Sequence, residues 1–137
     1  MRLGAWVLIA GLAFAVPVEA QQPTGAELTN PVPPAAKSIA AGRQLYQRFC
    51  AACHGEAAKG NGPLSPRNVH PPDLTDAEWL HGSSDGEIFT NIREGIGPSF
   101  EMKSMKSRMT TTEIWHVVNY LRSIGTGAES RSPAPSP

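Results

Sequence analysis

Apolar and small residues recur at helical spacing between residues 38 and 49. One face of an α-helix, at positions i, i+3, i+4 and i+7, is occupied by Gly42, Leu45, Tyr46 and Phe49. Ser38 precedes them and is a good N-cap residue. Gly42 lowers helix stability by about 1 kcal/mol against Ala. That cost is offset if a second helix backbone crosses closely there; otherwise Gly42 is a tolerated surface glycine.

The strongest helical pattern lies near the C-terminus. Thr110 and Glu113 have the Ser/Thr-x-x-Glu spacing of a capping box, in which each residue bonds the backbone N–H of the other. An apolar stripe follows, made of Ile114, Val117, Val118 and Leu121. Gly125 is a natural C-terminal stop. These signals predict an amphipathic helix with one buried face.

Two further capping boxes lie between these helices, and each predicts a shorter helix. The first, at residues 75–78, opens a turn that carries Trp79. The second, at residues 84–87, opens a helix that ends at Gly95. Residues 55–73 are rich in Gly and Pro and predict a loop. No segment has the pattern of a clear strand, so the predicted fold class is all-α.

The N-terminus has the features of a secretory signal peptide at residues 1–20. Arg2 is followed by an apolar run from residue 3 to residue 16, and small residues precede a cleavage point after Ala20. The run is shorter than the ~20 apolar residues that a membrane-spanning helix needs. We therefore expect export to the periplasm and no transmembrane anchor once the signal is cleaved.

Proline-rich segments flank one ordered domain. Residues 21–37 predict an extended linker, and residues 127–137 predict a disordered tail. The ordered domain is then residues 38–126. A domain of this size has a thin hydrophobic core, so a large apolar cofactor would supply filling that the side chains lack.

The charge balance argues against some classes of partner. The chain has twelve Lys plus Arg and twelve Asp plus Glu residues, so its formal net charge is zero. A nucleic-acid-binding domain would need a basic face, which this balance does not suggest. The balance also does not predict a strongly charged docking partner.

Residues 50–54 read Cys-Ala-Ala-Cys-His and contain the only two cysteines of the sequence. This spacing is the signature of covalent c-type haem attachment. The thiols of Cys50 and Cys53 can add to the two vinyl groups of one porphyrin, and His54 is then placed under the ring, where its imidazole can bind iron. We predict one haem c per chain, with His54 as an iron ligand.

Other uses of two cysteines fit the sequence less well. A thioredoxin-type redox disulfide usually follows a strand in a βαβ unit, and no such unit precedes residue 50. A zinc site needs four ligands; His70 and His81 could complete one with the two cysteines, but at spacings that match no common zinc module. An iron–sulfur cluster normally needs four thiolates. Haem is therefore the favoured cofactor, with disulfide and zinc as alternatives.

The order of these features resembles a class I, monohaem cytochrome c domain. The resemblance covers nearly all of the ordered chain and depends on Gly42-x-x-x-Tyr46, the CAACH motif, a glycine loop, a middle helix, a Met-containing loop, and a last helix with Trp115 and Tyr120-Leu121. It implies a small cytochrome c fold with helices wrapped around one haem. It also implies that the first and last helices cross where Gly42 and Tyr46 meet the region of Tyr120.

The resemblance also implies how the iron is held. His54 would bind iron through Nε2, and its Nδ1–H would donate to a proline carbonyl in the following loop, for which Pro63 and Pro66 are both placed. The family often has a distal methionine in a Met-Pro-x-Phe sequence about a dozen residues before the tryptophan of the last helix. Met102 stands at that place.

The methionine loop also departs from the family pattern. Lys103 stands where proline is common, and Met105 takes the place of the phenylalanine. Met105, Met109 or a histidine therefore stay as alternatives to Met102 for the distal ligand. The methionines that do not bind iron would fill the core against the haem.

The function that these features predict is one-electron transfer. We expect an exported monohaem c-type cytochrome with His54 and Met102 as axial ligands, which carries electrons between redox proteins and is not an enzyme. One alternative is an electron-transfer subunit of a specific dehydrogenase or oxidase complex. Another is a haem enzyme or gas sensor with an open distal site, against which the three methionines argue. We expect a monomer or a subunit of a larger redox complex.

Overall fold

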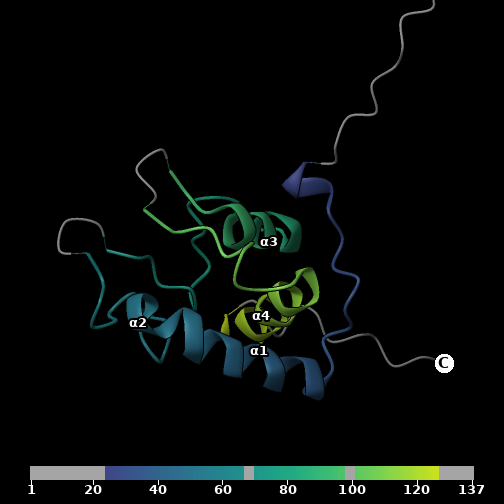
Figure 1. Ribbon diagram of the computed structural model, residues 1–137, viewed down its shortest axis with the longest axis horizontal. Coiled ribbons are helices and arrows are strands. Elements are labelled where there is room, and N and C mark those ends of the chain that lie inside the picture. Colours follow the sequence, from purple (N-terminus) through teal and green to yellow (C-terminus); the bar gives the residue numbers. More distant parts are fainter. Residues whose placement is uncertain (1–23, 67–69, 98–100, 127–137) are drawn as a thin grey trace, which may run out of the picture.

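The computed structural model describes residues 24–66, 70–97 and 101–126, and within them the chain is helical (Figure 1). The elements are a 3-10 helix, η1 (Gly25–Glu27), and four α-helices: α1 (Ala36–Phe49), α2 (Ala51–His54), α3 (Asp85–Glu94) and α4 (Thr111–Ile124). These ranges hold no strand, and their only ladder pairing is an isolated bridge between Ile96 and Met102. The predicted all-α class is confirmed.

Helices α1 and α4 cross in contact, as the resemblance implied (Figure 1). A Cβ atom at Gly42 would overlap the carbonyl oxygen of His116, so the two backbones touch at this point. Beside it, the rings of Tyr46 and Tyr120 lie 5.3 Å apart between centroids. The glycine on the buried face of α1 is therefore explained by a close helix approach.

Helix α4 is the centre of the fold, because it contacts both α1 and α3. Its apolar stripe is almost completely enclosed, with Ile114, Val117 and Val118 at most 1% exposed. On the α3 side, Phe89 stacks on Trp115 with 4.1 Å between ring centroids. Burial of this stripe stabilises the fold, since removing a large aliphatic side chain from water contributes about 1.5–3 kcal/mol.

Two of the predicted capping boxes are confirmed and two other helix signals are wrong. Thr110 caps α4 and Ser84 caps α3, each with its glutamate partner. Ser38 does not cap α1, which begins two residues earlier at Ala36. Its side chain instead lies inside the fold, where it accepts a 2.8 Å hydrogen bond from Nδ2 of Asn119.

The helical turn predicted at residues 75–78 is a series of bends. The reason is a competing acceptor: the backbone N–H and Oγ1 of Thr75 both donate to Oδ1 of Asp73, at 2.8 and 2.6 Å. Lys59 donates to the other oxygen of this carboxylate at 3.0 Å and also contacts Oγ1 of Thr75. The Thr75 side chain is therefore not available as an N-cap.

Residues 24–35, which the sequence led us to expect within a linker, lie against α3 and α4. In Figure 1 this segment runs down from η1 to the start of α1. Leu28 and Val32 pack on the core. Asn30 donates to Oδ1 of Asn119 at 2.8 Å, and Nδ2 of Asn119 donates to the carbonyl of Val32 at 3.0 Å. Tertiary contacts thus extend beyond the boundary that we placed at residue 38.

The ends of the chain were assigned from sequence alone. The predicted signal peptide at residues 1–20 and the predicted tail at residues 127–137 lie outside the described residues. Among the residues that are described, no helix is both long and apolar enough to cross a bilayer.

Candidate haem site

The Cys-Ala-Ala-Cys-His segment forms the one-turn helix α2, with Cys50 at its N-cap. The last carbonyls of any helix lack intrahelical partners and need donors from elsewhere. Here the following loop folds back and supplies backbone N–H groups: Leu64 to Ala52 at 2.7 Å, Gly62 to Cys53 at 3.1 Å and Gly60 to His54 at 2.8 Å. The backbone under both cysteines and the histidine is therefore fixed by the protein itself.

Glycine is required at two positions of this loop. A Cβ atom at Gly62 would lie 2.5 Å from the carbonyl oxygen of Ala52. Gly60 has a φ of +74°, and a Cβ there would overlap the carbonyl oxygen of Pro71. The sequence indicated a glycine loop but not that this loop bonds the end of α2. The alternating glycines at positions 60 and 62, close after the motif, were the signal that could have indicated it.

Both cysteines of α2 are free and half-buried. Burial, and to a smaller extent the neighbouring Cys53, raises the pKa of the Cys50 thiol to about 12. The Cys53 thiol is 3.6 Å from the carbonyl oxygen of Leu64, a weak hydrogen bond. This donor set fits the two thioether links of haem c.

The imidazole of His54 is neutral, and its Nδ1 has no partner among the described residues. Burial lowers its pKa, because desolvation disfavours the charged ring. Nδ1 is buried and makes no hydrogen bond to any group in the described ranges, so the expected bond to the carbonyl of Pro63 or Pro66 is not seen. A buried nitrogen without a partner is costly in a plain core residue. The neutral ring is the form that can bind iron through Nε2.

The zinc alternative finds no support in the geometry. Across the residues that the structure describes, no three His, Cys, Asp or Glu side chains gather as a metal group. His70 and His81 are described and exposed, and neither joins the two cysteines. The alternative of a disulfide between Cys50 and Cys53 is also not realised, since both thiols are free.

Three methionines follow α3, and they differ in environment. Met109 is 5% exposed and belongs to the hydrophobic core. Met102 and Met105 are half-buried at the edge of that core. Met102 is held by a pair of backbone hydrogen bonds with Ile96, of 2.9 and 3.3 Å, whereas the N–H of Met105 donates to the carbonyl of Ile92 at 3.0 Å. Met102 and Met105 are thus both tied to the end of α3.

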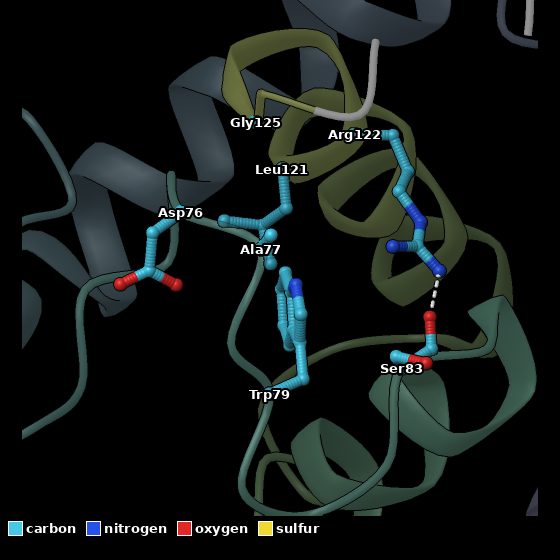
Figure 2. Close-up of a pocket in the computed structure, with 7 residues that line it drawn as sticks. All are labelled: Asp76, Ala77, Trp79, Ser83, Leu121, Arg122 and Gly125. Atoms are coloured by element: carbon cyan, nitrogen blue, oxygen red, sulfur yellow. Dashed lines mark hydrogen bonds between the residues drawn. The ribbon is translucent and has the colours of Figure 1, made fainter. Parts of the chain in front are cut away.

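A separate cleft of about 200 Å³ lies where the end of α4 meets the segment before α3. Figure 2 shows the Trp79 ring and the Arg122 side chain on its walls. Arg122 donates through Nε to Asp85 at 2.7 Å and through Nη2 to the carbonyl of Ser83, and its guanidinium stands 5.6 Å from the centre of the Trp79 ring. These contacts join α4 to the start of α3, and the cleft contains none of the predicted haem residues.

Comparison with known proteins agrees with this arrangement. The family model described as cytochrome c oxidase, cbb3-type, subunit III matches residues 37–121, which is more than half of the chain. The chain is 38% identical over 91 residues to the cbb3-type oxidase subunit FixP of a Bradyrhizobium species, covering 64% of this chain and 28% of FixP. It is 36% identical over 92 residues to the subunit CcoP of Rhodobacter capsulatus, covering 64% of this chain and 29% of CcoP.

A solved structure shows the same fold. Cytochrome cL from Methylophaga aminisulfidivorans superposes with a TM-score of 0.55 and 28% identity, over 74% of this chain and 61% of that one. The chain spans less than a third of the length of the curated relatives above. The class I cytochrome c resemblance is confirmed, and with it covalently bound haem c and its iron as the cofactor. Over residues 37–121, the part that forms a cytochrome c domain, the chain belongs to the family of cbb3-type cytochrome c oxidase subunit III.

Proposed function

We propose that this protein is a one-electron carrier in which Cys50 and Cys53 would hold a haem covalently and His54 and Met102 would bind its iron. The observation that carries the proposal is helix α2, which brings two free thiols and a neutral imidazole together on one turn. The haem, when bound, supplies a ferric/ferrous couple. The chain then needs to bind, orient and shield it, and to make no bond in a substrate.

The fixed backbone under α2 suits this task. Three loop N–H groups already hold the carbonyls of residues 52–54, so the backbone that carries the sulfurs and the imidazole has a set position. Ligands that stay in place in both oxidation states leave little to reorganise when an electron arrives. The apolar core around α4 keeps water away, and a neutral methionine thioether favours the ferrous state, which raises the potential.

Met102 is proposed as the distal ligand on two grounds. It stands at the family position counted back from Trp115, and its backbone is paired on both sides with Ile96. Met105 takes the place of an aromatic residue in the same pattern, and we assign it to packing against the haem.

We further propose that the carrier works with a larger redox complex, as an electron-transfer subunit or as its dedicated donor. The support is that the relatives are named as subunits of a cbb3-type oxidase and that the shared part is the cytochrome c module. Its partners are redox proteins rather than nucleic acid. We place this exchange in the periplasm, with export directed by the signal at residues 1–20.

The test is maturation in a host equipped for c-type haem attachment. We expect a red protein whose mass is increased by one haem, and whose visible spectrum in the reduced form is unchanged by carbon monoxide. Colourless protein of unaltered mass would refute it, and prompt carbon monoxide binding would favour an open distal site instead. Co-purification of a tagged copy with an oxidase or dehydrogenase would distinguish a complex subunit from a free carrier.

A further inference from the structure

Tyr46 connects the interior of α1 to the ligand turn. Its side chain is 0% exposed, and its hydroxyl donates a 2.8 Å hydrogen bond to the carbonyl of Gly55, the residue that follows His54. Both ends of this bond are buried. The ring packs against Tyr120 in the crossing with α4. One polar atom therefore reaches from the helix crossing to the carbonyl of the residue that follows the proposed iron ligand.

This hydroxyl completes a series of carbonyl partners. The carbonyls of residues 52, 53 and 54 accept backbone N–H groups from the glycine loop. The next carbonyl in line, that of Gly55, accepts two donors, the N–H of Ala58 at 3.1 Å and the hydroxyl of Tyr46. Gly55 has a φ of +81° and turns the chain sharply away from α2, and of these two bonds the one from Tyr46 ties this turn to α1. The end of α2 is thus held by the loop on one side and by α1 on the other.

The chemical state of Tyr46 is suited to a permanent donor. Burial, followed by the neighbouring Cys50 and Tyr120, raises the pKa of its hydroxyl above the ordinary value, so the proton stays on. Without this hydroxyl the Gly55 carbonyl would keep only the N–H of Ala58, and the turn that follows His54 would lose its tie to α1. A buried polar group with fewer partners is costly, so this turn would shift to recover one, and the strain would reach the adjoining His54.

We propose that the hydroxyl of Tyr46 is a positioning group for His54, which sets the orientation of the imidazole toward the iron by holding the Gly55 peptide. This inference rests on the proposed function, in which His54 is the axial ligand. It differs from a packing role, for which the ring alone would be enough.

Tyr120 offers a matched control. It is another tyrosine in the same helix crossing, 8% exposed and in ring contact with Tyr46. Its hydroxyl makes no hydrogen bond to the described part of the chain. Tyr120→Phe therefore removes a hydroxyl from the same region without touching the Gly55 carbonyl.

The experiment compares holoproteins carrying Tyr46→Phe or Tyr120→Phe with the wild type. The readouts are the haem methyl proton shifts of the ferric form, which report the orientation of the axial imidazole, and the reduction midpoint. We expect Tyr46→Phe to displace the methyl shifts and to raise the midpoint, because a poorly held imidazole is a weaker donor to ferric iron. Tyr120→Phe should leave both near the wild-type values.

The proposal is overturned if Tyr46→Phe changes these readouts no more than Tyr120→Phe does, even where its melting temperature falls. Should Tyr46→Phe not acquire haem, 3-fluorotyrosine at position 46 keeps the ring and hydroxyl and alters only the donor strength; unchanged methyl shifts there would also overturn it. Failure of the proposed function is a separate result, since the wild type itself would then lack haem or His54 ligation.

Discussion

The proximal and distal sides of the proposed haem site are held by different kinds of interaction. On the proximal side, the carbonyls of residues 52–55 all accept N–H groups from the glycine loop, and the last of them also accepts the Tyr46 hydroxyl of α1. On the distal side, the methionine loop is bonded to α3 and the residues after it, through the Ile96–Met102 pair, the N–H groups of Met105 and Lys106, and the Ser104 side chain. The first is a short motif held from two directions, and the second is a loop held along its length from one direction.

This difference explains why one side can be assigned from sequence more sharply than the other. Covalent attachment demands two thiols and a histidine at one spacing, so five consecutive residues specify the chemistry. A distal thioether can come from any methionine that the loop brings near.

Gly60→Ala should destabilise the loop that holds α2 on the proximal side. The added Cβ would overlap the Pro71 carbonyl oxygen, in a backbone conformation with φ of +74° that alanine disfavours. We expect a loss of about 3 kcal/mol in the free energy of unfolding, measured by denaturant titration of the holoprotein. Gly125→Ala is the control, because its Cβ would meet only the Leu121 carbonyl oxygen at 3.5 Å. Equal stability of the two variants would contradict the role given to the glycine loop.

Met102→Ala should open the distal side while leaving the proximal side intact. The variant is expected to keep its covalent haem, to lose the thioether–ferric absorption band, and to bind carbon monoxide. Met105→Ala should keep the band, and as a truncated half-buried residue should lose about 2 kcal/mol of stability at most. Loss of the band in Met105→Ala alone would reverse the assignment.

Thr110→Ala tests the helix that supports the distal loop. The Thr110 side chain accepts the Glu113 N–H at 3.3 Å, and Glu113 accepts the Thr110 N–H at 2.7 Å. Removing this cap should lower the free energy of unfolding by about 1 kcal/mol. Thr111→Ala, one residue inside the helix, should have a smaller effect; the reverse order would show that the cap does not matter.

Asp73 provides a test by pH. Hydrogen bonds from Thr75, assisted by Lys59, lower the pKa of this carboxyl to about 2 from an ordinary 3.8. Since the folded pKa is the lower one, its stabilising contribution is fully present above the ordinary value. It is lost as pH falls from about 4 to about 2. Asp73→Asn should therefore make the thermal midpoint depend less on pH across this window. A pH dependence of the midpoint equal to that of the wild type would show that the Asp73 carboxylate does not stabilise the loop.

Local signals located most of the helices, and their failures have a common cause. The capping boxes at Thr110 and Ser84 work as the sequence indicated, because both partners lie within one turn. Thr75 and Ser38 look like equally good N-caps but are used elsewhere. Each has a stronger partner supplied by the fold, Asp73 for Thr75 and Asn119 for Ser38.

The N-terminal segment shows the same principle on a larger scale. Its prolines indicated an extended linker, and residues 24–35 do lack a long helix. Composition gave no sign that Asn30 would meet Asn119, which is 89 positions away along the chain. That pairing depends on where α4 comes to lie, and no local pattern carries this information.

By itself, the amino-acid sequence determined the cofactor chemistry, the helical class and the register of the main helices, because these depend on residue spacings within a few turns. Only the tertiary structure decided that Gly60 and Gly62 cap α2, that Tyr46 reaches the Gly55 carbonyl, and that residues 24–35 pack on α4. Those contacts join polar groups that become neighbours only after the helices cross, where burial makes each unpaired donor or acceptor costly.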